Sequence, residues 1–346
     1  MKIITEISKR LGSKPLVALA PMVNHSERAY RVLTKQYGVS LAYSPMLNSY
    51  NFGKSSKYRL QNFQFDSCKE DRPLIVQFCG NDPDTLLNAA RYVEDHCDAV
   101  DVNFGCPQKI ARKGNYGAFL IDSDSDIMER IISKLAQNLS VPVTAKIRLP
   151  PQKNMACALA KRLENAGCSL LCVHGRTRFE NKTKAGRADW KEIKNIKQAL
   201  KIPVFANGSI ASVDDIKACM DFTSVDGVCV GESLLSFPSL LTLKTNSSNR
   251  TQLMINYRDQ LHVAYEYLDL VEQYYTKNWK NHVYKLLQPH LCALSPNAKN
   301  LRVQLSGCKT IPECRNFLEI ISTMISHIED ATIDPKFTYY YRHRRM

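Results

Sequence analysis

Residues 98–120 read DAVDVNFGCPQKIARKGNYGAFL, and this stretch contains the unit from which the fold is built. Residues 99–103 are a short apolar and β-branched run of the kind found in buried parallel strands. A loop rich in glycine and proline follows, and it carries the thiol of Cys106. A cysteine on such a loop is more typical of chemistry than of packing. We therefore predict a strand over 99–103 and a reactive Cys106 beyond its end.

The same unit recurs along the chain, and most gaps between the apolar runs have the periodicity of a helix. The eight predicted strands are residues 16–20, 40–44, 74–78, 99–103, 142–147, 170–174, 203–206 and 225–230. The predicted helices include residues 84–95, 125–137, 154–166, 190–200 and 213–220. Eight such units over about 230 residues predict an α/β protein with a closed (β/α)8 TIM barrel. A doubly wound sheet shows the same alternation but fits eight units less well.

The barrel is expected to occupy residues 1–243, and the sequence then changes character. Residues 244–252 are predicted to be a linker and residues 253–346 a small all-α helical bundle. Apolar stripes over 261–271 and 314–328 support the bundle, and Thr310 and Glu313 have capping-box spacing before the second stripe. Within the barrel, the polar residues 48–72 are expected to form an excursion over its top. The tail YYYRHRR, residues 339–345, either binds RNA or is a frayed terminus.

The composition limits the class of protein. With 346 residues, 44% of them hydrophobic, the chain is long enough for a barrel and a smaller domain. The N-terminal sequence lacks the apolar core of a secretory signal, and the longest apolar run, residues 16–23, is too short to span a bilayer. The 12 cysteines are scattered without a CxxC pair, which argues against disulfides and bound metal. We expect a soluble intracellular protein, cytoplasmic, nuclear or both, with no metal and no membrane association.

The net charge of +14 is concentrated in residues 146–201, which contain 14 Lys and Arg against 4 Asp and Glu. The cations form a basic loop and then a helix face: Arg176, Arg178, Lys182, Lys184 and Arg187, followed by Lys191, Lys194, Lys197 and Lys201. Lysines on a helix face are often merely solvated. A basic loop beside them favours a polyanionic partner such as nucleic acid.

Polar residues and glycines follow the predicted strands at the end where barrels place their active sites. The set, at or just beyond each strand end, is Pro21, Met22 and Val23 for the first strand, Gln77 for the third, Asn103 and Cys106 for the fourth, Lys146 and Arg148 for the fifth, His174 and Arg176 for the sixth, Asn207, Gly208 and Ser209 for the seventh, and Gly231 and Glu232 for the eighth. The loops after the last two strands suit phosphate binding by backbone N–H groups. The joint occurrence of these residues predicts an active site.

Residues 101–120, together with RPLIVQFCGNDP at 72–83, resemble the signature motifs of the tRNA dihydrouridine synthases, and the resemblance extends from about residue 15 to residue 238. It implies a flavin-binding barrel followed by a helical tRNA-recognition domain. It also implies that FMN is re-reduced by NADPH or NADH. The residues that match the FMN-binding positions are Pro21, Met22, Val23, Gln77, Lys146, His174, Asn207, Gly208, Ser209, Gly231 and Glu232.

By the same resemblance, Cys106 is the catalytic residue and gives a proton to C5 of uracil while hydride from the reduced flavin reaches C6. Asn103 and Arg148 match positions expected to face the uracil or the flavin edge. Because they lie in the basic loop, Arg176 and Arg178 are expected to bind the substrate. The partner is then tRNA, from which the target base is flipped out, and the protein is expected to be a monomer.

Gln108 after the GCP triplet is similar to the eukaryotic branch of the family, which acts on positions 16 and 17 of the tRNA D-loop. Asn24 and His25 depart from the pattern of that branch. Two other interpretations remain open. One is a small-molecule flavin barrel resembling dihydroorotate dehydrogenase, against which the basic residues 146–201 argue; the other is a tRNA-binding flavoprotein without catalysis.

Overall fold

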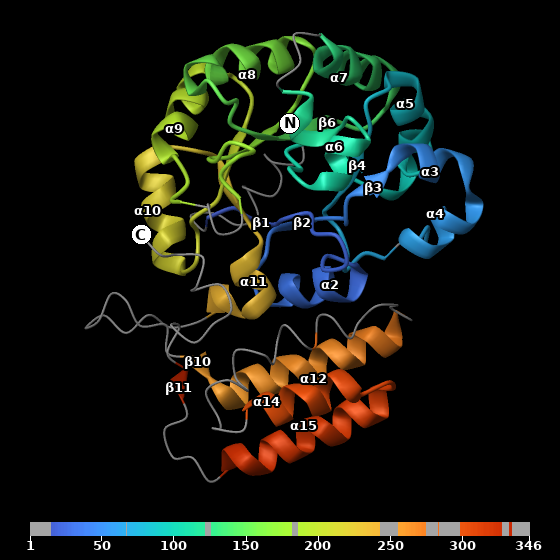
Figure 1. Ribbon diagram of the computed structural model, residues 1–346, viewed down its shortest axis with the longest axis vertical. Helices are drawn as coiled ribbons and strands as arrows, with labels where there is room; N and C mark the ends of the chain where they lie inside the picture. The colour runs from blue at the N-terminus through green and yellow to red at the C-terminus, as the bar shows by residue number, and fades with distance from the viewer. Residues whose placement is uncertain are drawn as a thin grey trace.

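The computed structural model describes residues 15–66, 68–121, 126–181, 186–242, 255–274, 283, 298–326 and 332–333. Parallel strands form a closed barrel surrounded by helices (Figure 1). The barrel strands are β1 (Val17–Leu19), β2 (Leu41–Tyr43), β4 (Leu74–Cys79), β5 (Ala99–Phe104), β6 (Val143–Arg148), β7 (Leu171–His174), β8 (Val204–Asn207) and β9 (Gly227–Val230). Each pairs with the next, and β9 pairs with β1. The predicted TIM barrel is therefore confirmed, since a doubly wound sheet would have two edge strands.

Helices cover the outside of the barrel, and several begin at a side-chain cap. They are α2 (Arg28–Gln36), α5 (Pro83–Arg91), α7 (Ile127–Asn138), α8 (Ala156–Asn165), α9 (Trp190–Ala199), α10 (Val213–Thr223) and α11 (Glu232–Ser236). Asp82, Asp189 and Ser212 accept hydrogen bonds from backbone N–H groups in the first turns of α5, α9 and α10. The five predicted helices are confirmed. The first of them is shorter than predicted, because α5 gives way to a separate 3-10 turn, η1 (Glu94–His96).

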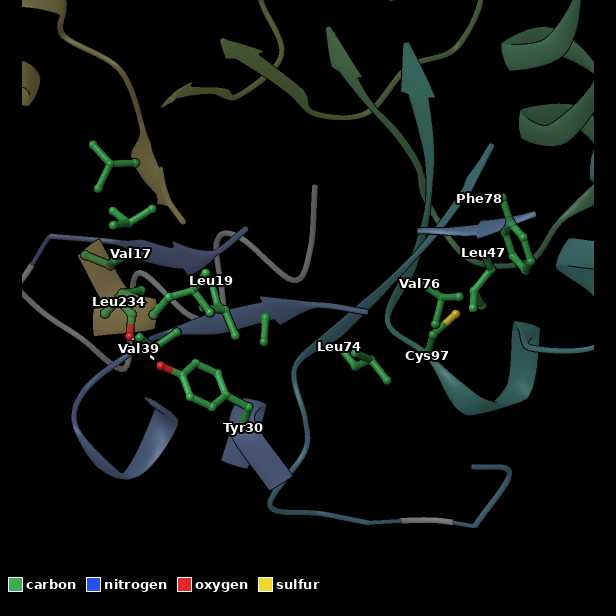
Figure 2. Close-up of a cluster of buried hydrophobic side chains, with 14 of the residues drawn as sticks. Val17, Leu19, Tyr30, Val39, Leu47, Leu74, Val76, Phe78, Cys97 and Leu234 are labelled. Atoms are coloured by element: carbon green, nitrogen blue, oxygen red, sulfur yellow. Dashed lines mark hydrogen bonds between the residues drawn. The ribbon is translucent and has the colours of Figure 1, made fainter. Parts of the chain in front are cut away.

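Two sets of buried side chains hold the barrel together. Strand residues that point outward pack against helices, as Val17 does beside Leu234 of α11 (Figure 2). The hydroxyl of Tyr30 donates a 2.6 Å hydrogen bond to the carbonyl oxygen of Leu234. Alternate residues point inward, and Tyr43 and Phe205 are fully buried there. Side chains alternate between the two faces of each strand, and the polar residues lie at the carboxyl ends of the strands.

The predicted excursion over residues 48–72 contains its own short elements, which sequence reasoning missed. They are β3 (Leu47–Asn48), α3 (Ser49–Lys54) and α4 (Ser56–Asn62), and β3 extends the pairing of β4 beyond β2. Asn48 and Ser55 cap the two helices. Phe52 is fully buried, with its ring centroid 5.2 Å from that of Phe78. The excursion is therefore packed onto the barrel through an aromatic core.

The C-terminal region contributes α12 (Tyr257–Gln273), α14 (Ala298–Gly307) and α15 (Ile311–Ser326), which lie together below α2 and α11 in Figure 1. The first predicted apolar stripe lies on α12 and the second lies on α15 as far as residue 326, beyond which it falls outside the described residues; Thr310 caps α15 by accepting from the N–H of Glu313. The antiparallel pair β10 (Ile255–Asn256) and β11 (Thr332–Ile333) was not predicted. Residues 244–252 and the tail 339–345 lie outside the described residues. In the ranges that are described, no helix has the length and apolarity to cross a membrane.

A carboxyl group lies where the barrel meets α12. The hydroxyl of Tyr267 donates a 2.7 Å hydrogen bond to Oε1 of Glu27, and its ring lies edge-on to Tyr30. Burial raises the pKa of Glu27 to about 7, although the hydrogen bond from Tyr267 acts in the opposite direction. Because the folded pKa lies above the unfolded one, this group destabilises the protein as the pH rises from about 4.5 to 7.

Glu27→Gln removes this titration while keeping an acceptor for Tyr267. We expect the variant to raise the free energy of unfolding by about 1–3 kcal/mol at pH 8 and to leave it unchanged at pH 4, since one pKa unit corresponds to about 1.4 kcal/mol. Urea unfolding at the two pH values measures both effects. A destabilised variant at pH 8 would mean that the ionised carboxylate holds the contact together.

Candidate active site

The register of the barrel brings the predicted polar residues to one end. In neighbouring strands Gln77 lies opposite Asp101, Asn103 opposite Lys146, and His174 opposite both Arg148 and Asn207. Residues two apart on a strand share a face, so Thr144, Lys146 and Arg148 of β6 all point into the barrel. The strand ends therefore carry a continuous polar layer above an apolar barrel interior.

A buried hydrogen-bond network orients the residues of β4 and β5. The side-chain amide of Gln77 donates to Oδ2 of Asp101 at 2.8 Å and accepts from Nδ2 of Asn103 at 2.8 Å. Thr144 donates to Oδ1 of Asp101 at 2.6 Å. Burial raises the pKa of Asp101 to about 6 against these hydrogen bonds and the charge of Lys146. Asp101 and Thr144 were not predicted, although their two-residue spacing from Asn103 and Lys146 was a usable signal.

Asn103 fixes the start of the loop that carries Cys106. Its Oδ1 accepts from the backbone N–H of Gly105 at 3.0 Å and from that of Cys106 at 2.9 Å. The Cys106 side chain is half-buried and packs against an apolar cluster that contains Cys79 and Tyr116. Burial raises the pKa of the Cys106 thiol, outweighing the backbone hydrogen bond at Gln108 and the charge of Arg148. The thiol is therefore protonated at neutral pH and is suited to donate a proton.

Cations converge on the opposite side of the layer. Nζ of Lys146 donates to Oδ1 of Asn207 at 2.9 Å, and Asn207 donates in turn to the carbonyl oxygen of Cys229 at 2.6 Å. His174 lies beside this pair, and Nη1 of Arg176 is 3.2 Å from its Nε2. Burial and the neighbouring cations, Arg148 and Lys146 included, hold the pKa of His174 well below its ordinary value. A neutral imidazole among three cations favours an anionic or electron-accepting ligand.

Arg148 connects the two loops of the site. Its guanidinium donates to the carbonyl oxygen of Gly105 at 3.1 Å and to those of Thr177 at 2.9 Å and Glu180 at 3.2 Å. Burial, together with the charge of Arg176, lowers the pKa of Arg148 to about 10, so it remains a cation at neutral pH. The structure thus places Arg148 as a brace between the Cys106 loop and the loop after β7. Its predicted position at the substrate edge stays a prediction.

The loops after β8 and β9 lie next to these cations. Gly208 has a φ of +105°, and a Cβ there would lie 2.9 Å from Cδ2 of His174, so glycine is needed for this approach. Oγ of Ser209 accepts from Nη2 of Arg176 at 3.2 Å. A Cβ on Gly231 would lie 3.4 Å from Sδ of Met22, which brings the loops after β9 and β1 together.

The structure brings most of the predicted residues together and places the rest at the rim. Glu232 begins α11 directly after Gly231, and Pro21 and Met22 are half-buried at the end of β1. Val23 is 51% exposed. The guanidinium carbon of Arg178 lies 5.2 Å from the centroid of the Phe119 ring and 4.1 Å from that of Phe179, and its role in substrate binding stays a prediction. Lys182 and Lys184 lie outside the described residues, and among those described no group of three or more His, Cys, Asp or Glu could hold a metal ion.

Comparisons with known proteins give the family of the chain. The family model described as dihydrouridine synthase (Dus) matches residues 18–328. The chain is 41% identical over 310 residues to a tRNA-dihydrouridine(16/17) synthase-like protein of Mus musculus, covering 88% of this chain and 61% of that protein. It is also 41% identical over 287 residues to the tRNA-dihydrouridine(16/17) synthase of Schizosaccharomyces pombe, covering 80% of this chain and 70% of that protein. The chain therefore spans about three fifths of the length of the mouse relative.

Solved structures support the barrel at much lower sequence identity. The histamine dehydrogenase of Rhizobium sp. 4-9 superposes with a TM-score of 0.50 at 11% identity, over 65% of this chain and 45% of that one. This similarity concerns the fold alone. The family match over most of the chain is what identifies it: the protein belongs to the dihydrouridine synthase (Dus) family.

Proposed function

We propose that the protein is an FMN-dependent tRNA-dihydrouridine synthase that reduces uridines of the tRNA D-loop, at positions 16 and 17, with NADPH or NADH as reductant. The observation that carries the proposal is the position of Cys106, whose backbone N–H Asn103 holds at the edge of a cationic polar layer. The names of the relatives support the substrate, the positions and the use of NAD(P). A monomeric state and a cytoplasmic or nuclear location stay predictions.

The residues present fit FMN. Lys146 and Arg176 supply positive charge beside His174, and the positive φ at Gly208 and Ser209 lets the loop after β8 pass close to His174. We assign Lys146, His174 and Asn207 to the flavin ring, and the loops at Gly208–Ser209 and Gly231–Glu232 to its phosphate through backbone N–H groups. Pro21, Met22, Val23 and Gln77 complete the set. Any contact at Glu232 would use its backbone, since a carboxylate repels phosphate.

The chemistry follows from the positions of the protein groups. A bound, reduced flavin supplies the hydride that reaches C6 of uracil. Cys106 delivers its proton to C5, so that one hydride and one proton convert the double bond to a single bond. Asn103 orients the loop that holds the thiol, and Arg148 joins this loop to that after β7. The resulting thiolate regains its proton from water.

The experiment that tests the proposal maps dihydrouridine in unmodified tRNA after incubation with the FMN-loaded protein and NADPH or NADH. New dihydrouridine at positions 16 and 17 is expected. Dihydrouridine at other positions would retain the chemistry and reject the positions. An intact flavoprotein that forms none, but oxidises free dihydroorotate, would replace the proposal with the small-molecule interpretation.

Lys146→Met should bind FMN about 10- to 100-fold more weakly, because it removes a charge-assisted hydrogen-bond donor worth about 1.5–3 kcal/mol. Flavin fluorescence during titration of the flavin-free protein measures the affinity. Lys153→Met is the matched control, since Lys153 is half-exposed on the same end of the barrel and pairs with Asp189 at 3.1 Å. Equal FMN affinity of the Lys146 variant and the wild type would remove Lys146 from the flavin site.

A further inference from the structure

An exposed aromatic ring stands on the loop after β7, beside the candidate site. The side chain of Phe179 is 55% exposed. Single exposed apolar side chains are ordinary on protein surfaces and need no function. The turn beneath Phe179, however, is held by hydrogen bonds of its own and by Arg148 at the end of β6.

Hydrogen bonds fix both sides of this turn. The backbone N–H of Thr177 donates to Oε2 of Glu180 at 2.7 Å, and the side chain of Asn181 donates to the carbonyl oxygen of Arg178 at 2.6 Å. The buried guanidinium of Arg148 donates to the carbonyl oxygens of Thr177 and Glu180. Phe179 is thus presented on a pre-organised turn, and a partner that binds the ring need not order the loop first.

A cation and a second ring connect Phe179 to the Cys106 loop. The guanidinium carbon of Arg178 lies 4.1 Å from the centroid of the Phe179 ring and 5.2 Å from that of Phe119. Phe119 belongs to η2 (Gly117–Phe119), and the backbone N–H of Ala118 in this turn donates to the carbonyl oxygen of Cys106 at 3.1 Å. Phe179 is therefore separated from the Cys106 loop by one arginine and one phenylalanine.

The surrounding rim combines exposed apolar groups with positive charge. Ile110 is 63% exposed on α6 (Lys109–Lys113), and Met155 is 56% exposed on η3 (Lys153–Met155). Both elements follow barrel strands at the same end as the Phe179 turn. The helix α6 also carries Lys109, Arg112 and Lys113, all exposed, without an acidic residue. Apolar faces among cations complement an RNA loop whose bases are unstacked, because such a loop offers both phosphates and ring faces.

We propose that Phe179 is a stacking platform for a nucleobase that flanks the reacting base in the substrate RNA, held in place by Arg178. This inference rests on the proposed function and adds a residue that determines how the RNA strand is seated. Withdrawing the target base from the tRNA fold exposes its neighbours. A fixed ring one loop away from Cys106 can stack on one of these neighbouring bases and offset the stacking that is lost when the target base is withdrawn.

The test compares three substitutions of Phe179 in the full-length, FMN-loaded protein, with unmodified tRNA and no reductant. Phe179→Ala and Phe179→Leu should each weaken tRNA binding roughly tenfold, the effect of losing one base–aromatic stack. Phe179→Trp should bind like the wild type, and the fluorescence of the added indole should be quenched by tRNA. Because Leu preserves apolar contact but not stacking, it separates the two kinds of interaction.

Phe222→Ala is the matched control, since Phe222 is 47% exposed on α10 at the other end of the barrel and has Nζ of Lys194 5.1 Å from its ring. It should leave binding unchanged, and thermal melting should show that all variants are folded. Wild-type affinity for Phe179→Ala or Phe179→Leu, or an unquenched indole, would overturn the inference. A wild-type protein that neither binds tRNA nor forms dihydrouridine would instead overturn the proposed function.

Discussion

Cys106→Ala should form dihydrouridine roughly 100- to 10,000-fold more slowly than the wild type, the range that a positioned general acid contributes. The change removes the proton donor alone, because Asn103 holds the loop through backbone N–H groups that alanine keeps. The purified variant should therefore remain yellow and should bind tRNA with unchanged affinity. Single-turnover formation of dihydrouridine with pre-reduced protein measures the effect directly.

The control is Cys157→Ala, which removes another half-buried thiol from α8, outside the polar layer. This variant should react at the wild-type rate. Because burial raises the pKa of Cys106, the wild-type rate should stay constant through neutral pH and fall only above the ordinary range of cysteine, as the donor loses its proton. A Cys106→Ala variant with a normal yield and rate would assign the proton to another group or to water.

The barrel could be predicted because its strands are buried on both sides and therefore appear as nearly continuous apolar runs. The same feature concealed Asp101 and Thr144, which interrupt such runs. Their function depends on contacts across strands, from Gln77 to Asp101 and from Thr144 to Asp101, and that register is fixed by barrel closure and not by local sequence. The strand-end residues could be predicted by position. Their hydrogen-bond partners could not be predicted. Arg148, for example, donates to three carbonyl oxygens in segments that are distant from it in sequence.

Long side chains on loops were hardest to place. Arg178 was predicted to bind the substrate because it lies in a basic loop, and that stays a prediction; the sequence did not indicate that its guanidinium lies close to the Phe119 and Phe179 rings. Phe119 and Phe179 gave no sign of this arrangement, since an aromatic residue in a loop is as often packed inward as exposed. The conformation depends on the turn at 177–181, which Arg148 holds from another strand. Tertiary contacts of this kind decide the details of the rim, whereas the position of the rim itself follows from the strands.

Asp71→Asn should lower the free energy of unfolding by about 3–5 kcal/mol, the cost of breaking a buried ion pair by removing one partner. Asp71 is 2% exposed at the end of the excursion over residues 48–72 and faces three cations of α2. Nε of Arg31 donates to its Oδ1 at 2.8 Å, and Arg28 and Lys35 lie 3.6 Å from its carboxylate oxygens. Without the carboxylate, these buried cations would repel one another.

The stability that Asp71 contributes should depend on pH with the opposite sign to that of Glu27. Burial alone would raise the pKa of Asp71, but Arg31, Lys35 and Arg28 together hold it below its ordinary value. The stabilisation is therefore present above the unfolded pKa of about 4 and is lost as the pH falls through the lower folded pKa. Asp66→Asn is the matched control, since Asp66 also pairs with Arg28 but its side chain is 69% exposed. An exposed pair contributes at most about 1 kcal/mol. If urea unfolding at pH 7 gave equal losses of unfolding free energy for the two variants, the ion pairs of Asp71 would not be what fixes the excursion to α2.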